Sequence, residues 1–75
     1  MNVVLYTRSG CHLCEVAREL LEDFNTAPTV VDIDTEPSLI ERFDNCVPVV
    51  EINRQIRFRG RVDPILLRRI LEREA

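Results

Sequence analysis

The sequence of 75 residues lacks the features that define several common protein classes. It has no apolar run near the roughly 18 residues that a membrane-spanning helix needs, so we expect no integral membrane protein. It also lacks an excess of positive charge, because 10 Lys and Arg residues stand against 13 Asp and Glu residues, a formal net charge of -3. Proteins that bind duplex nucleic acid are normally basic, so this balance argues against a nucleic-acid partner.

The cysteine content does not fit a secreted disulfide scaffold. Three cysteines cannot all pair within one chain, whereas thiols in a reducing cytosol stay available for chemistry. Met1 and Asn2 lead directly into the apolar residues 3–6, without the basic region and cleavage site of an export signal. We therefore expect a cytoplasmic protein.

Internal repeats, low-complexity tracts and linkers are also missing, so residues 1–75 are expected to form a single domain. A chain of this size hides only about 60% of its unfolded surface, which leaves no room for a large internal cavity. Any chemistry must then lie at an edge or in a shallow groove. We expect the domain to act as a monomer.

The first half of the chain predicts a β-α-β unit. Residues 3–7 are β-formers that end at the breaker sequence 8–10, and residues 29–34 are β-branched and apolar enough for a buried strand. Two strands joined by one helix suggest a right-handed parallel pair. Between them lies a helical stripe that we expect to face the core, formed by Leu13, Val16, Ala17, Leu20, Leu21 and Phe24.

The second half predicts a short helix followed by a β-hairpin. Residues 35–37 can open the helix, and residues 47–52 return to strand character. Asn53 and Arg54 can turn the chain, because Asn tolerates positive φ, and residues 55–58 would return as an antiparallel edge strand.

A last helix is predicted to begin at Asp63 and Pro64, because the carboxylate can cap the first turn and proline needs no amide partner there. We assign its buried face to Ile65, Leu66, Leu67, Ile70 and Leu71. The predicted order is β-α-β-α-β-β-α, an α/β fold with a four-stranded mixed sheet and helices on its faces. Functional groups of such sheets lie beyond the strand ends.

Cys11 and Cys14 lie at the predicted junction between the first strand and the first helix. A helix start carries unpaired amides and a partial positive charge, which stabilise a thiolate at Cys11; Arg8 and a protonated His12 can add to this effect. The three-residue spacing places both sulfurs on one side of the first turn, within reach of a disulfide. We assign attack on a substrate to Cys11 and resolution to Cys14, which lies beside the apolar stripe and is expected to be more buried.

Other interpretations of the cysteines remain open at this point. A structural zinc site normally has a second cysteine pair, which is missing here, and the adjacent Cys11 and His12 would struggle to bind one tetrahedral ion. Cys46 could complete a metal site or an iron–sulfur cluster shared between two chains, act as a third redox thiol, or be a small core residue. We predict no metal ligand.

Two segments resemble the signatures of glutaredoxins. Residues 5–14, LYTRSGCHLC, are similar to the active-site strand and loop of that family, and residues 47–50, VPVV, resemble its second motif. The resemblance implies a thioredoxin-like fold and a cis Val47–Pro48 bond facing the redox pair. It also implies that the backbone of Val47 pairs with the bound thiol substrate.

The same resemblance implies further substrate-binding positions. Glutaredoxins hold glutathione through a basic residue before the cysteine motif, which corresponds to Arg8, and through a later glycine–aspartate segment, here reduced to Gly60 and Asp63. His12 replaces the usual proline and Leu13 the usual aromatic residue of dithiol members. A cation at His12 beside the thiolate would make the pair a better oxidant.

The sequence thus predicts a glutaredoxin-like thiol-disulfide oxidoreductase with a Cys11–Cys14 redox pair. Its expected substrates are protein disulfides or glutathione mixed disulfides, with no bound cofactor and with glutathione as a candidate reductant or co-substrate. The alternative is a thioredoxin-fold binding or adaptor module that holds a partner without turnover.

Overall fold

The computed structural model describes residues 1–74 and contains one sheet with three α-helices. The sheet has the strand order β2-β1-β3-β4. Its strands are β1 (Val3–Thr7), β2 (Thr29–Asp32), β3 (Val49–Ile52) and β4 (Gln55–Arg59). Its helices are α1 (His12–Asp23), α2 (Pro37–Phe43) and α3 (Pro64–Glu74), with a short 3-10 turn, η1 (Ile33–Thr35), after β2.

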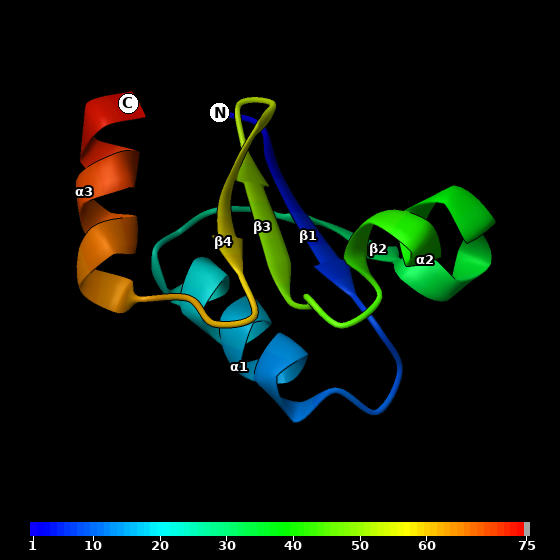
Figure 1. The fold of residues 1–75 in the computed structure, drawn as a ribbon. Helices are drawn as coiled ribbons and strands as arrows, with labels where there is room; N and C mark the ends of the chain where they lie inside the picture. Colours follow the sequence, from blue (N-terminus) through cyan, green and yellow to red (C-terminus); the bar gives the residue numbers. More distant parts are fainter. Residues whose placement is uncertain (75) are drawn as a thin grey trace.

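The strand pairing confirms the predicted mixed sheet. Strand β1 runs parallel to β2 and antiparallel to β3, and β3 runs antiparallel to the edge strand β4. Helices α1 and α3 lie on one side of the sheet and α2 lies near β2 on the other (Figure 1). Tyr6 near the end of β1 pairs with Val49 at the start of β3. The chain leaving β1 and the chain entering β3 therefore meet at the same end of the strands.

Alternation along the strands divides the apolar residues between two core clusters. In β1, Leu5 faces α1 and α3, whereas Tyr6 packs on the α2 side against Phe43, with ring centroids 4.7 Å apart. The larger cluster holds the fully buried Leu21 of α1 and Leu67 of α3. The smaller cluster consists of Ile33, Phe43 and Val49, with partly buried neighbours around them.

Two predicted strands are shorter than the sequence pattern suggests. Strand β2 ends at Asp32, because the Asp32 carboxylate accepts a hydrogen bond of 2.9 Å from the Asp34 amide and turns the backbone into η1. Strand β3 starts at Val49, since Pro48 has no N–H for the sheet ladder.

The buried faces of two helices also differ from prediction. In α3, Ile65 is 70% and Leu66 45% exposed, because they lie about 200° and 100° around the helix from Leu67. In α1, the buried side is formed by Cys14, Ala17 and Leu21, while two predicted core residues are 43% and 46% exposed. These are Leu13 and Val16.

The β3–β4 hairpin turns at Asn53 and Arg54, which have φ values of 50° and 70°. The predicted turn and edge strand are confirmed. The register between β3 and β4 shifts after Val50, because Val50 pairs with Phe58 and Glu51 with Ile56. The extra residue, Arg57, reaches α3, where its Nη2 lies 3.0 Å from the Glu74 carboxylate.

Candidate functional site

Cys11 and Cys14 occupy the first turn of α1. Cys11 is the N-cap residue, with extended backbone angles, and its Sγ accepts a hydrogen bond of 3.2 Å from the Cys14 amide. Cys11 is partly exposed, whereas Cys14 has 3% of its surface exposed, so the predicted difference in burial is confirmed. The first turn of α1 thus directs a backbone amide at the sulfur of Cys11.

The loop before Cys11 is a tight turn. The Cys11 amide donates a hydrogen bond of 3.2 Å to the Arg8 carbonyl. Gly10 has a φ of 79°, a backbone conformation that is strained for any residue with a side chain. The turn therefore directs the chain from the end of β1 into the start of α1 with Cys11 at the cap position.

The environment separates the chemistry of the two thiols. Burial, followed by the hydrogen bond with Cys11, raises the pKa of the Cys14 thiol to about 11. Cys14 is therefore a neutral thiol at pH 7, and it becomes a good nucleophile only after it loses its proton during a reaction. The partly exposed Cys11 is the sulfur that an outside molecule can reach.

Val47 and Pro48 lie between α2 and β3, at the end of the sheet where β1 finishes. Their peptide bond is cis, Pro48 is fully buried and Val47 packs against the smaller core cluster. The Pro48 carbonyl accepts a hydrogen bond of 2.8 Å from the Gly60 amide, and Gly60 has a φ of 86°. The predicted positions at residues 48 and 60 are thus in direct contact.

Asp63, which the sequence offers as a helix cap or a substrate ligand, caps α3. Its Oδ1 accepts hydrogen bonds from the Ile65 amide at 2.9 Å and from the Leu66 amide at 3.3 Å. The capping prediction is confirmed.

Two hollows flank the cysteine turn. One, of about 270 Å³, contains both thiols together with Arg8, Glu15 and Arg18. The other, of about 330 Å³, is lined by His12, Leu13, Val16, Ala17, Leu20, Arg61 and Val62. His12 is exposed, and its Nδ1 lies 3.9 Å from the Glu15 carboxylate. The structure therefore places Arg8 on one side of the thiols and the His12–Leu13 pair on the other.

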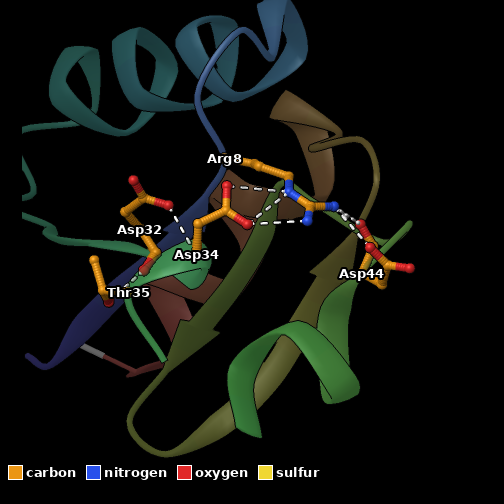
Figure 2. Close-up of polar contacts among 5 residues, drawn as sticks. All are labelled: Arg8, Asp32, Asp34, Thr35 and Asp44. Carbon is orange, nitrogen blue, oxygen red and sulfur yellow. Dashed lines mark hydrogen bonds and ion pairs between the residues drawn. The ribbon is translucent and has the colours of Figure 1, made fainter. Parts of the chain in front are cut away.

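Arg8, a predicted substrate-binding residue, is paired with two carboxylates of the protein itself. Its Nε and Nη2 bind the Asp34 carboxylate at 2.9–3.2 Å, and its Nη1 lies 2.7 Å from Asp44 Oδ1 (Figure 2). The hydrogen bonds that Arg8 donates to Asp34, and then those to Asp44, raise the pKa of Arg8 further above its ordinary value. The cation is thus permanently charged and doubly paired.

Sequence reasoning missed the partners of Arg8. Neither Asp34 nor Asp44 stands in a motif that would mark it as a partner of Arg8. The two carboxylates lie 26 and 36 residues from Arg8 along the chain, so only the tertiary fold brings them together.

Within residues 1–74, no three His, Cys, Asp or Glu side chains are arranged to hold a metal ion. Each helix in that part of the chain is too short or too polar to cross a bilayer.

Comparison with known families identifies the family of this chain. Residues 2–72 match the glutaredoxin-like domain family (DUF836). The chain belongs to the glutaredoxin-like domain family. The glutaredoxin-like protein YDR286C homolog of Dictyostelium discoideum is 37% identical, and the match covers 84% of this chain and 68% of the relative.

Solved structures confirm the thioredoxin-like fold of this glutaredoxin-like chain. The X. campestris protein XcR50 is 30% identical, with a TM-score of 0.82 over 95% of this chain and 96% of that protein. The glutaredoxin-like protein NrdH-redoxin from Escherichia coli is 22% identical, with a TM-score of 0.74 over 93% of this chain and 95% of that protein, a likeness of fold alone. The fold and family support a redox-type function.

Proposed function

We propose that the protein is a thiol-disulfide oxidoreductase in which Cys11 attacks and Cys14 resolves. The observation that carries this proposal is the first turn of α1, where a partly exposed Cys11 sulfur accepts the amide hydrogen bond of a buried Cys14. A second observation supports different roles for the two cysteines: burial and the hydrogen bond with Cys11 raise the pKa of the Cys14 thiol.

The reaction begins with the Cys11 thiolate attacking one sulfur of a substrate disulfide. A Cys11–substrate disulfide forms, the substrate's own S–S bond breaks, and one substrate thiolate leaves and takes up a proton. Cys14 then loses its proton and attacks Cys11 Sγ, which releases the second substrate thiol. The substrate is reduced by two electrons, and the protein is left with a Cys11–Cys14 disulfide.

Val47 and Pro48 would align the substrate beside Cys11, with His12, Leu13 and the Gly60–Asp63 segment flanking it. We propose protein disulfides and glutathione mixed disulfides as substrates, and glutathione as the reductant that returns the Cys11–Cys14 disulfide to two thiols. The reaction needs no bound cofactor. We further propose that the protein acts as a cytoplasmic monomer.

The decisive experiment uses the Cys14→Ser variant with a disulfide substrate. The variant completes the first attack but has no resolving thiol, so a mixed disulfide at Cys11 accumulates and is seen by intact-mass measurement. The matched control is Cys46→Ser, which retains both reacting thiols and accumulates no adduct. If the Cys14→Ser variant traps nothing, or if Cys11→Ser binds partners as well as the wild type does, the adaptor alternative replaces the enzyme.

A further inference from the structure

Each nitrogen of the Arg8 guanidinium already has an oxygen partner. Nε binds both Asp34 oxygens, Nη2 binds Asp34 Oδ1, and Nη1 binds Asp44 Oδ1 and, at 3.3 Å, the Asp44 carbonyl. One positive charge is therefore opposed by two negative charges. A substrate carboxylate could bind Arg8 only by displacing a carboxylate of the protein.

The position of Asp34 is built into the fold. The Asp32 carboxylate accepts from the Asp34 amide at 2.9 Å, and the Thr35 hydroxyl donates to the Asp32 carbonyl at 2.7 Å, which together fix the η1 turn (Figure 2). Asp44 is held differently, as the residue that ends α2. The two counterions thus reach Arg8 from separate segments, and neither is a freely moving side chain of the cysteine loop.

Arg8 lines the hollow that contains both thiols. The other charged residues of this hollow, Glu15 and Arg18, have opposite signs. With Arg8 counterbalanced twice, this side of Cys11 offers no net positive charge to an incoming molecule. Electrostatic complementarity mainly determines which partners a site accepts and how fast they associate.

We propose that Asp34 and Asp44 are specificity-determining residues that withdraw Arg8 from substrates, so that Cys11 reacts in preference with neutral disulfides and disfavours anionic ones such as oxidised glutathione. This inference rests on the proposed function and narrows its two substrate classes, since it favours protein disulfides over disulfides that carry glutathione. The preferred substrate is then a disulfide without a carboxylate beside the attacked sulfur, as in a protein segment.

The test is a series of small disulfides of similar size and different charge: cystamine, 2-hydroxyethyl disulfide and dithiodiglycolate, together with oxidised glutathione. Each disulfide is the oxidant, and each reaction converts the two protein thiols into a Cys11–Cys14 disulfide and releases two small thiols. Single-turnover rates are measured by alkylation and intact mass. The readout is the ratio of the dithiodiglycolate rate to the 2-hydroxyethyl disulfide rate for each protein, so a general loss of activity cancels.

The main variant is Asp34→Asn with Asp44→Asn, which preserves side-chain shape but leaves Arg8 with uncharged partners. A substrate carboxylate binds a guanidinium more strongly than a neutral amide does. One unit charge at about 4 Å in water corresponds to about a fivefold change in rate, so we expect the ratio to rise by about fivefold. The oxidised glutathione rate should rise with it, and added salt should reduce both gains.

Two further variants separate the role of Arg8 from a general change in charge. Asp32→Asn with Glu36→Gln removes two negative charges from the same stretch without touching Arg8, and Asn still caps the η1 turn. We expect its ratio to stay near that of the wild type. Adding Arg8→Met to the main variant should abolish the gain.

The outcomes distinguish this inference from the proposed function. Three results would overturn the role of Asp34 and Asp44: no gain in the main variant, a gain that survives Arg8→Met, or an equal gain in the control variant. In each case, exchange with 2-hydroxyethyl disulfide would still support the proposed oxidoreductase activity. If the wild-type protein exchanges with none of the four disulfides, both proposals are wrong. The single variants Asp34→Asn and Asp44→Asn should each give part of the gain.

Discussion

The Gly60 amide donates a hydrogen bond of 2.8 Å to the Pro48 carbonyl. This bond joins the segment that leads from β4 to α3 with the segment that enters β3, next to the end of β1 where the cysteine turn begins. Gly60 makes the bond with a φ of 86°, a conformation that side chains disfavour.

Gly60→Ala should lower the free energy of unfolding by about 1 kcal/mol, because the left-handed backbone is strained for alanine. A Cβ at this position meets no atom within 4 Å, so the loss comes from the backbone and not from a clash. Gly60→Asn should lose less, since Asn tolerates this region better. Urea unfolding of the three proteins measures both values, and equal stability of all three would show that residue 60 relaxes to negative φ.

The stability of the reduced protein should fall between pH 9 and about pH 11. The folded pKa of Cys14 is raised from 9.0 to about 11 by burial and by its hydrogen bond with Cys11. A raised pKa favours the neutral thiol in the folded state, so its contribution is complete below pH 9 and is lost as pH rises through the folded value.

The measurement is urea unfolding at pH 7 and at pH 11 for the wild type and for Cys14→Ala. Tyr6, whose pKa is also raised by burial, titrates in both proteins and cancels in the comparison. The wild type should lose more stability than the variant over this interval. The same pH-dependent loss in both proteins would contradict a neutral, buried Cys14.

Asp63→Ala should destabilise the protein by about 1 kcal/mol, because two first-turn amides of α3 lose their acceptor. Asp63→Asn should lower the free energy of unfolding far less than Asp63→Ala does, since Asn caps a helix about as well as Asp. Thermal or urea unfolding compares the two. A slower exchange with oxidised glutathione in the stable Asp63→Asn variant would be the sign that the charge also contacts substrate.

His12→Phe should make the Cys11–Cys14 pair more reducing. A cation beside the thiolate stabilises the reduced form, and about 1 kcal/mol of such stabilisation corresponds to about 20 mV. His12→Lys places a permanent cation at this exposed position, so its Cys11–Cys14 pair should be more oxidising than that of His12→Phe. Equilibration in glutathione redox buffers, with free thiols counted by mass, measures all three; identical potentials for His12→Phe and wild type would remove His12 from the redox chemistry.

Local signals in the sequence were sufficient to predict the element order and the cysteine turn. The spacing of Cys11 and Cys14 at a strand-to-helix boundary is a short-range pattern, and so is the cap at Asp63. Helix faces were harder, because apolar residues such as Leu13 and Ile65 look like core residues until their angular position against the sheet is known. The pairing of Arg8 depends on residues from two distant segments, which no local pattern encodes.

The two edges of the sheet are poor places for another strand to attach. Strand β2 has only four residues and lies between Pro28 and the η1 turn, and β4 is interrupted by the bulge at Arg57. Short, bulged and charged edges discourage strand addition and aggregation. We therefore expect neither edge strand to pair with a strand of another protein.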